Sequence, residues 1–472
     1  MAVFQNNLLA GAGAQSSDST YTIDQSIRFN SGDSAVLNKT YSGAGSRTTF
    51  TYSCWLKVGD QTDSGSGFPL FNGGTGTSDT TWSGISYYRG DIRIQGYNTN
   101  WKIITRKLRD PAAWYHIVWV WDTTNAVASE RTRLYINGVR ETDFSTDNNP
   151  GASANAGIGQ AQQHSIGYQS RTVGWGYADA YFAEMVFLDG TATDCTSFGE
   201  FNSNGIWVPK DVSGLTFGTN GFHIDGRDSA DLGDDESGQG NDYTASGLAA
   251  HDRVLDSPTN NFCVMNSIEN VPCTFTQGNL TIDSTSNFSG AAIRGTVHIL
   301  GGSTGKWYYE VVGSLTGDYF STGWMLSSII TPGSTVIGQD VGSVAFYNTG
   351  SYQNTTNAQG AITKPAAGDV IGVGLDASTG QVFLRDDSGY FVGTLSSNAL
   401  SSGVVITGFS GEDLVMASRN SSSGTATYNF GQDGTFAGAK TAQGNTDANG
   451  IGNFFYTVPD GFLAICTKNL GS

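Results

Sequence analysis

Paired carboxylates are the first chemistry to look for in this chain. Hydrolysis of a glycosidic bond needs two acidic side chains on opposite sides of the scissile bond. The chain has 42 acidic residues, but a Glu-x-Asp-x-x-Glu pattern along one strand does not occur. Its glutamates are isolated from one another in sequence, at Glu130, Glu141, Glu184, Glu200, Glu236, Glu269, Glu310 and Glu412. We expect no glycosidase activity, short of an acid pair that only the tertiary structure brings together.

Nucleophilic catalysis also lacks its pattern. No Gly-x-Ser-x-Gly turn follows a strand and opens a helix, as the nucleophile elbow requires. His116 lies inside an aromatic strand phrase and is expected to be a hydrogen-bonded core or edge residue. The five histidines are far apart in the chain, at His116, His164, His223, His251 and His298. The sequence therefore predicts a protein that is not an enzyme.

One acidic loop is the best candidate for a metal site. Residues 231–242 read DLGDDESGQGND, and oxygen ligands on a flexible loop suit Ca²⁺. The candidate ligands are Asp231, Asp234, Asp235, Asn241 and Asp242. A solvated acidic turn explains the same residues, and the spacing of an EF-hand is absent. The absence of any CxxC spacing among the five cysteines disfavours zinc. No other cofactor is expected.

Aromatic residues in loop-like sequence are the candidate contacts for a glycan or receptor. Sugar C–H faces stack on aromatic rings while polar neighbours bind the hydroxyls. The alternative is that several of these rings cap a core, and we expect this of about half of them. The candidates are Trp82, Tyr87, Tyr88, Tyr97, Trp101, Trp175, Tyr177, Tyr319, Tyr347, Tyr352 and Tyr390.

The elements that would position these residues are β-strands. The runs 114–120 (WYHIVWV) and 306–312 (KWYYEVV) are β-branched and aromatic and are bounded by turn residues. Residues 131–136 nearly alternate apolar with polar, and Asn137-Gly138 follows as a strong hairpin signal. The 64 glycines fit many tight turns, since a glycine inside an element costs roughly 0.5–1 kcal/mol. No stretch keeps a helical apolar period. The sequence predicts an all-β fold.

Length and charge limit the organisation and the partners. A chain of 472 residues is too long for one ordinary core. The net charge of −18 disfavours nucleic acid and anionic membranes as partners. No apolar run reaches the ~20 residues of a membrane span, and the first residues do not read as a signal peptide. We therefore expect no membrane insertion. Assembly in a cytoplasm followed by release on lysis is one way to explain the missing export signal.

Five segments are predicted. Residues 1–24 would form an extended N-terminal arm that attaches to a neighbour, with Phe4, Leu8 and Leu9 as candidate contacts. Residues 25–215 would form a first sandwich, 216–270 an acidic, glycine-rich connection, and 271–436 a second sandwich. Residues 437–472 would form a C-terminal tail packed on the second sandwich.

Specific phrases connect both sandwiches with known families. Residues 26–29, 50–57, 114–118, 134–139 and 183–190 resemble strands of the concanavalin A-like lectin/glucanase superfamily, in its laminin-G-like branch. Residues 305–311, Gly323-Trp324, 368–373 and 428–431 resemble a SPRY domain, although residues 383–390 replace its usual Lys-Asn-Gly hairpin. The resemblance implies two antiparallel β-sandwiches, a lectin/glucanase-like jelly roll and then a SPRY-like one.

The order of these two domains resembles fibre or appendage proteins of marine tailed bacteriophages. That resemblance implies a structural protein of the virion, a tail or head fibre or a capsid decoration, located on the particle. It also implies contact with other virion proteins, self-association as a homotrimer, and binding of host-surface glycan or receptor. The alternatives are an architectural capsid cement protein and a secreted bacterial glycan-binding or glucanase-like protein.

Overall fold

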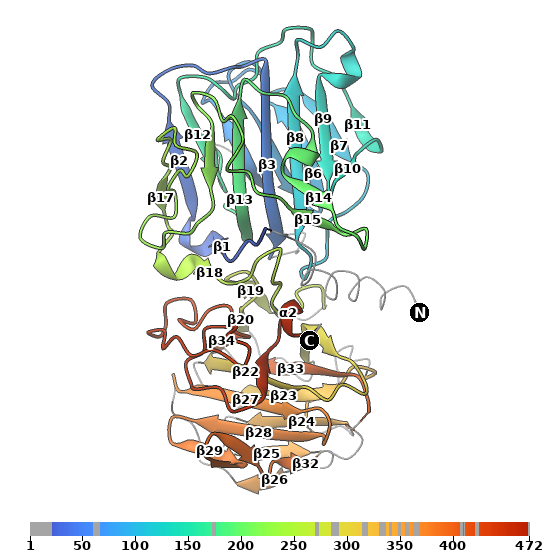
Figure 1. The fold of residues 1–472 in the computed structure, drawn as a ribbon, viewed down its shortest axis with the longest axis vertical. Coiled ribbons are helices and arrows are strands. Elements are labelled where there is room, and N and C mark those ends of the chain that lie inside the picture. Colours follow the sequence, from blue (N-terminus) through green and yellow to red (C-terminus); the bar gives the residue numbers. More distant parts are fainter. Residues whose placement is uncertain are drawn as a thin grey trace. The chain divides into compact units, whose positions relative to one another are not determined.

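The computed structural model describes two compact units, residues 21–260 and 261–470. Within these bounds it leaves out residues 60–66, 172–175, 270–272, 285–291, 314–319, 330–336, 339–341, 348–350, 355–357, 362–365, 367, 406–408, 410 and 421–423. We call the two parts the N-terminal unit and the C-terminal unit (Figure 1). No helix among the described residues is long and apolar enough to cross a membrane.

Two antiparallel sheets make up the N-terminal unit. Sheet I has the order β10 (Val139–Arg140), β9 (Thr132–Ile136), β8 (Tyr115–Asp122), β3 (Thr49–Val58), β13 (Ala180–Asp189), β1 (Ser26–Phe29) and β18 (Arg253–Val254), with β16 (Phe222–Ile224) also on β13. Sheet II has the order β11 (Phe144–Asp147), β7 (Asn100–Ile104), β6 (Asp91–Gly96), β5 (Ser83–Tyr88), β4 (Phe68–Gly73), β12 (Gln163–Ile166), β2 (Val36–Thr40) and β17 (Thr244–Ser246).

The core of this unit fills the space between the sheets. Alternate residues of β3 face it, among them Phe50, Tyr52 and Leu56, and on β8 Trp119 and Trp121 do the same. Each ring buried in this way stabilises the fold by roughly 1.5–3 kcal/mol. The two-residue turn at Asn137-Gly138 takes φ values of 50° and 77°, so the predicted hairpin between β9 and β10 is present.

The outer face of sheet I is also covered. After β13 the chain passes through η3 (Cys195–Ser197), β14 (Gly199–Phe201) and β15 (Trp207–Pro209). Apolar side chains of this return segment pack on Trp55, Val118 and Val120 of the sheet. The side chains of the return segment that do so are Cys195, Phe198, Trp207, Val212 and Phe217. The chain then adds β16, β17 and β18 to the two sheets. Residues 216–260, expected as part of a connection, are thus strands and turns of the N-terminal unit.

One strand of sheet I carries an extra residue. Ala183 of β13 lies opposite Trp55 of β3, but Val186 lies opposite Ser53. Between these two pairs, Glu184 and Met185 of β13 lie opposite the single residue Cys54 of β3, which is a β-bulge. Glu184 lies in the bulge with φ +47°, a left-handed conformation that a residue with a side chain rarely adopts. The bulge keeps Phe182, Met185 and Phe187 in the core while Val186 faces the return segment.

A buried ion pair closes the N-terminal unit. Lys57 Nζ lies 2.7 Å from Asp256 Oδ2, and both side chains are fully buried. Trp114 Nε1 donates to Asp256 Oδ1 at 3.1 Å. Three residues later, the Thr259 hydroxyl donates to the Ile23 carbonyl and accepts from its amide. The turn at 256–260 thus ties the beginning of the unit to its end.

The sheets of the C-terminal unit are also antiparallel apart from one pairing. Sheet III has the order β19 (Thr274–Thr276), β20 (Thr281–Ser284), β34 (Gly424–Asn429), β22 (Lys306–Gly313), β27 (Val370–Asp376), β28 (Gln381–Asp386) and β29 (Gly389–Val392), with β32 (Val404–Val405) on β28. Sheet IV has the order β21 (Ile293–Ile299), β33 (Leu414–Asn420), β23 (Phe320–Leu326), β24 (Ser343–Tyr347), β25 (Ser351–Asn354) and β26 (Ala358–Ala361). A separate hairpin pairs β30 (Thr394–Ser396) with β31 (Ala399–Ser401). The core of the C-terminal unit contains Trp307, Tyr309, Trp324 and Phe346. The predicted all-β fold of two sandwiches is confirmed.

The last segment of the chain packs on this unit through a buried carboxylate. The strand β35 (Phe462–Ala464) runs parallel to β22, and α2 (Thr467–Leu470) follows. Glu310 of β22 accepts hydrogen bonds at 2.8 Å from the amides of Phe455 and Tyr456. Burial raises the pKa of Glu310 to about 7, although these two bonds and those from Tyr308 and Asn429 lower it.

Removing the partner of Lys57 tests the closing ion pair. We expect Asp256→Asn to lower the free energy of unfolding of the N-terminal unit by about 3–5 kcal/mol, because it leaves a buried ammonium without a counterion. Urea unfolding of the full chain measures this. Glu130→Gln is the control, because Glu130 pairs with Arg140 at 2.8 Å on the surface and should cost under about 1 kcal/mol. Equal losses in the two variants would contradict the assignment.

The raised pKa of Glu310 predicts a pH dependence. A carboxyl whose pKa is higher in the folded state favours folding most when protonated, so its contribution is complete below pH 4.5 and is lost as the pH rises to about 7. We expect this part of the free energy of unfolding to fall by on the order of 3 kcal/mol over that range.

Comparing wild type with Glu310→Gln in urea at pH 4.5 and pH 8 isolates this contribution. The variant should be less stable than wild type at both pH values, because its amide nitrogen faces hydrogen-bond donors, and it should lack the Glu310-dependent slope. The same slope in both proteins would assign the pH dependence to other groups.

Candidate functional site

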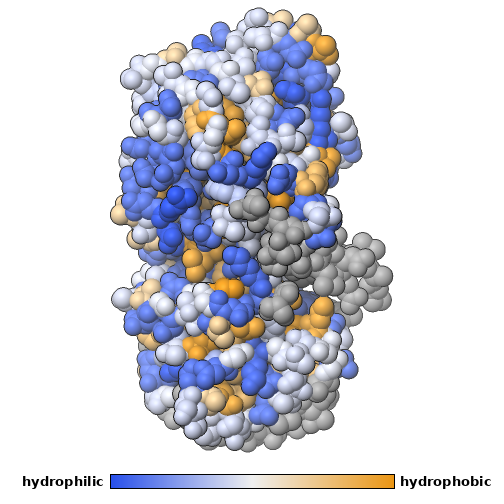
Figure 2. Space-filling view, in the orientation of Figure 1, coloured by the Kyte–Doolittle hydropathy of each residue, from blue (hydrophilic) through white to orange (hydrophobic). Residues whose placement is uncertain are grey.

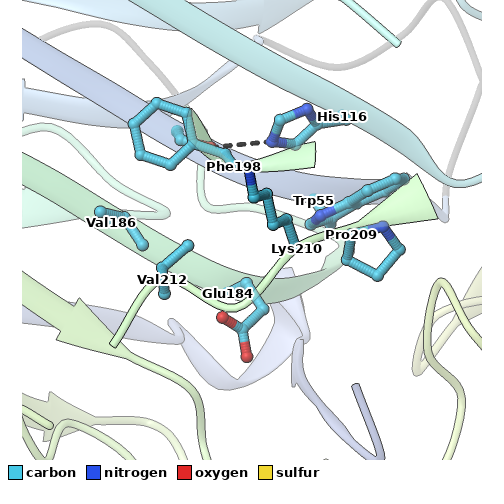
Figure 3. A pocket seen from close by; sticks show the side chains of 9 residues that line it. Trp55, His116, Glu184, Val186, Phe198, Pro209, Lys210 and Val212 are labelled. Carbon is cyan, nitrogen blue, oxygen red and sulfur yellow. Dashed lines mark hydrogen bonds between the residues drawn. The ribbon is translucent and has the colours of Figure 1, made fainter. Parts of the chain in front are cut away.

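A small pocket lies on the outer face of sheet I, beneath the return segment (Figure 3). It is lined by Ser53, Trp55, His116, Glu184, Val186, Phe198, Pro209, Lys210 and Val212. Two sets of buried polar side chains border it, one around His116 and one around Glu184. Figure 3 shows these two residues on opposite sides of the Lys210 side chain.

His116 forms a hydrogen-bonded chain with Ser53 and Trp207. Trp207 Nε1 lies 2.9 Å from His116 Nδ1, and Ser53 Oγ lies 2.8 Å from His116 Nε2. An indole N–H can only donate, so Nδ1 is the acceptor and the imidazole proton is on Nε2, facing Ser53. Burial lowers the pKa of His116 to about 3. This imidazole cannot take a proton from Ser53, so the pair resembles a catalytic dyad only in its distances.

A second set joins Glu184, His223 and Tyr21. His223 Nε2 lies 2.9 Å from Glu184 Oε2, and the Tyr21 hydroxyl donates to Glu184 Oε1 at 3.0 Å. Burial alone would lower the pKa of His223, but the hydrogen bond to Glu184 and nearby carboxylate charges outweigh it and raise the pKa. Burial and the Glu184 charge raise the pKa of the Tyr21 hydroxyl.

Asp225 completes this set. Ligand atoms of Glu184, His223 and Asp225 all lie within 4.8 Å of one another, and all three residues are buried. The sequence shows Glu184 only as one of several isolated glutamates and predicts no role for His223 or Asp225. One signal was available, because in Phe222-His223-Ile224 a histidine alternates with two core residues and must face the opposite side of the strand.

In the acidic loop, carboxylates bind the backbone. Asp235 Oδ1 accepts from the amides of His223 and Ser237, and Oδ2 accepts from the Asn241 amide and the Ser237 hydroxyl. Asp231 and Asp242 also accept backbone amides, and the Asn241 side-chain amide donates to two carbonyls. Burial and the neighbouring carboxylates, Asp242 among them, raise the pKa of Asp234. Among the described residues, these hydrogen bonds hold the loop in its conformation without an ion. Calcium binding stays a prediction.

Several of the predicted aromatic contacts lie in the interior. The exposed fractions are 2% for Trp82, 5% for Tyr87, 6% for Trp101 and 4% for Tyr347. Tyr87 and Trp101 belong to the core between the sheets, and the Trp82 indole donates to Asn72 Oδ1 at 3.2 Å. These four side chains are core or supporting residues, so they do not offer a ring face to a partner.

Three predicted aromatic residues are at least partly exposed. Tyr88 lies at the end of β5, Tyr97 follows β6 and is 39% exposed, and Tyr177 stacks on Tyr168 with ring centroids 3.9 Å apart. Trp175, Tyr319 and the attachment candidates Phe4, Leu8 and Leu9 lie outside the described residues. Tyr352 and Tyr390 lie in β25 and β29, and the structure does not describe their side chains.

Arginines stack on two of these tyrosines. The Arg93 guanidinium lies 3.9 Å and that of Arg89 5.3 Å from the Tyr88 ring centroid, and that of Arg171 lies 4.3 Å from the Tyr97 centroid. We call these five residues the Tyr–Arg surface. Tyr88 and Arg93 face away from the core, since Tyr87, Ile92 and Ile94 point into it.

Charge distinguishes this region from the rest of the chain. The segment 89–109 holds six of the 24 basic residues, Arg89, Arg93, Lys102, Arg106, Lys107 and Arg109, and only one acidic residue. Asp91 pairs with Arg93 and Lys107, Lys102 with Asp147, and Arg106 with Glu141. Arg93 Nε and Arg171 Nε are buried nitrogen atoms without a hydrogen-bond partner among the described residues. This basic run is visible in the sequence and could have indicated a contact surface in this region.

Comparison with known proteins finds a region in each unit that matches a family model. Residues 29–194 match the family model of the concanavalin A-like lectin/glucanases superfamily, and residues 306–415 match that of the SPRY domain. The chain therefore combines a concanavalin A-like domain with a SPRY domain, as predicted, and these domains suggest carbohydrate or protein binding. No curated protein matches the chain.

Similar solved structures match only part of the chain. The TRIM65 PSpry domain is 11% identical with a TM-score of 0.28, covering 36% of this chain and 92% of that one. Stonustoxin is 15% identical with a TM-score of 0.27, covering 35% of this chain and 27% of that one. The SPRY domain of human HERC1 is 9% identical with a TM-score of 0.27, covering 35% and 96%.

The assigned tautomer of His116 can be tested by NMR. We expect the imidazole to stay neutral with its proton on Nε2 from pH 4.5 to pH 9, because Trp207 occupies Nδ1 and burial disfavours the charged form. Imidazole ¹⁵N shifts of the full chain report this. In Trp207→Phe, Nδ1 loses its donor, and we expect an unfolding penalty of about 1–3 kcal/mol. A His116 that titrates near its ordinary pKa would contradict the assignment.

Proposed function

We propose that the chain is a non-enzymatic structural component of a phage virion, a tail or head fibre or a decoration protein, that binds glycan or receptor on the host surface. The observation that carries this proposal is the combination of a concanavalin A-like domain and a SPRY domain in one chain. Both domains suggest binding, and two binding domains in one polypeptide suit a subunit that links a particle to a surface.

The Tyr–Arg surface is the proposed contact with glycan. Tyr88 lies opposite Asp91, the first residue of the six-residue strand β6, and Tyr97 follows its last residue, so the two tyrosines are roughly 20 Å apart at about 3.3 Å per residue. That spacing fits a polysaccharide segment better than a single sugar. Each arginine of this surface could donate from its guanidinium group to hydroxyl or carboxylate oxygens of the ligand.

The geometry around the pocket supports binding rather than chemistry. His116 holds its proton toward Ser53 and cannot activate that hydroxyl. The carboxylates of Glu184 and Asp225 lie together in one buried cluster, whereas a glycosidase needs its two carboxyl groups on either side of an accessible sugar. Figure 2 shows a mainly hydrophilic visible face on the N-terminal unit with separate apolar patches, which suits a polar ligand.

The proposed partners are other virion proteins and further copies of this chain, with a homotrimer favoured. The proposed location is the virion. Immunogold labelling of particles tests both location and role. Label on fibres that project from the particle would support the proposal, whereas label spread over the capsid shell would favour the cement protein, and unlabelled particles would favour a secreted protein.

Glycan binding can be tested with the full chain on an array of neutral and acidic polysaccharides. We expect binding, and we expect Arg171→Ala and Tyr97→Ala to weaken it about tenfold or more, because each removes one stacked pair. Arg140→Ala is the control, because Arg140 is an exposed arginine on β10 of sheet I. Absence of binding by the wild type, or equal binding by all variants, would contradict this contact.

A further inference from the structure

We propose that Glu184, His223 and Asp225 bind a divalent transition-metal ion, with Zn²⁺ the favoured ion. This site is separate from the Tyr–Arg surface and from the acidic loop, and it does not depend on the proposed function. It uses no cysteine, so the missing CxxC spacing does not bear on it.

Three backbone features bring the ligands together. The bulge in β13 turns Glu184 out of the core toward the return segment. His223 of β16 lies opposite Val186 of β13 and faces the same side, since Phe222 and Ile224 point into the core. Asp225 directly follows β16. The ligand atoms then lie within 4.8 Å of one another, and Nε2 of His223 is 2.9 Å from Oε2 of Glu184.

One carboxylate oxygen in the cluster is paired with an arginine that is open to solvent. The Asp225 side chain is only 3% exposed, and its Oδ2 lies 2.9 Å from a guanidinium nitrogen of Arg227, whose side chain is 64% exposed. Among the described residues this oxygen accepts no well-aligned hydrogen bond. A buried carboxylate needs a counter-charge, and Arg227 supplies it in this structure. An arginine so open to solvent can swing away and leave the oxygen to an ion.

The donor set selects the kind of ion. One imidazole nitrogen and two carboxylates suit Zn²⁺ or Mn²⁺, whereas Ca²⁺ takes oxygen ligands. Zinc binds these atoms at about 2.0–2.2 Å, so small side-chain rotations would bring the three ligands around one ion. The ion would replace the proton between His223 and Glu184.

The neighbouring residues already orient the ligands. The Tyr21 hydroxyl binds Oε1 of Glu184 and leaves Oε2 directed at His223. Gln25 Nε2 donates to the Asp225 carbonyl at 3.3 Å, which fixes the backbone at the third ligand. Outer contacts of this kind hold ligands in place at metal sites. In the acidic loop, by contrast, both oxygens of Asp235 are already occupied by donors.

Titration of the tag-free full chain with ZnCl₂ in a calorimeter tests the proposal. We expect one Zn²⁺ per chain, with binding weakened at least tenfold in Glu184→Gln and in His223→Gln. Arg227→Ala should bind as tightly as wild type or more tightly, because it removes the competing charge. Asp234→Asn in the acidic loop is the matched control and should bind like wild type. Ca²⁺ should not compete at equal concentration.

Two further measurements guard against a variant that simply misfolds. Circular dichroism and melting without metal establish that each variant is folded, and anomalous diffraction from zinc-soaked wild-type crystals locates the ion directly. Wild-type protein that binds no zinc, or zinc binding that Glu184→Gln and His223→Gln leave intact while folded, would overturn the proposal. Zinc density at other residues would do the same. None of these outcomes bears on glycan binding by the Tyr–Arg surface.

Discussion

The β-bulge in β13 is the constraint on which the buried polar cluster of the N-terminal unit depends. β13 pairs with β1, β3 and β16, so its register sets the position of most of sheet I. The chain supplies one residue more than β3 requires, and Glu184 absorbs it in a left-handed conformation that costs about 1–3 kcal/mol. Packing alone gives no reason for that cost, because Phe182 and Met185 would alternate regularly if Glu184 were absent. Glu184, which interrupts the regular alternation of β13, is also the residue around which the buried polar cluster forms.

The return segment determines which face of the unit is available to a partner. It covers the outer face of sheet I with an apolar layer, and the hydrogen bond from Trp207 to buried His116 anchors that layer. This bond fixes one arrangement of the cover, since a misplaced Trp207 would leave a buried polar group unsatisfied. Sheet II instead carries arginines and tyrosines on its outer side. In the proposed function, the covered face of sheet I is structural and the outer side of sheet II is the contact face.

Local patterns in the sequence were sufficient for the fold and insufficient for the site. Alternation in β9 and the Asn137-Gly138 turn identified a hairpin, and aromatic runs identified β8 and β22, because these signals need only neighbouring residues. Trp82 and Trp101 were misplaced because glycine and asparagine around them suggested loops, whereas long-range pairing makes this region part of sheet II. Glu184 and His223 are 39 residues apart in sequence. The bulge that brings them together cannot be predicted from the two-residue alternation of a strand.

We infer that Glu184 is present for the buried cluster and not for the packing of the sandwich. Deleting Glu184 tests this inference, since the deletion removes the extra residue and leaves regular alternation in β13. Thermal unfolding of the full chain followed by circular dichroism is the measurement. We expect a folded protein whose first transition shifts by only a few degrees, about what 1 kcal/mol produces. Loss of that transition, with the N-terminal unit unfolded, would show that the bulge is required by the fold.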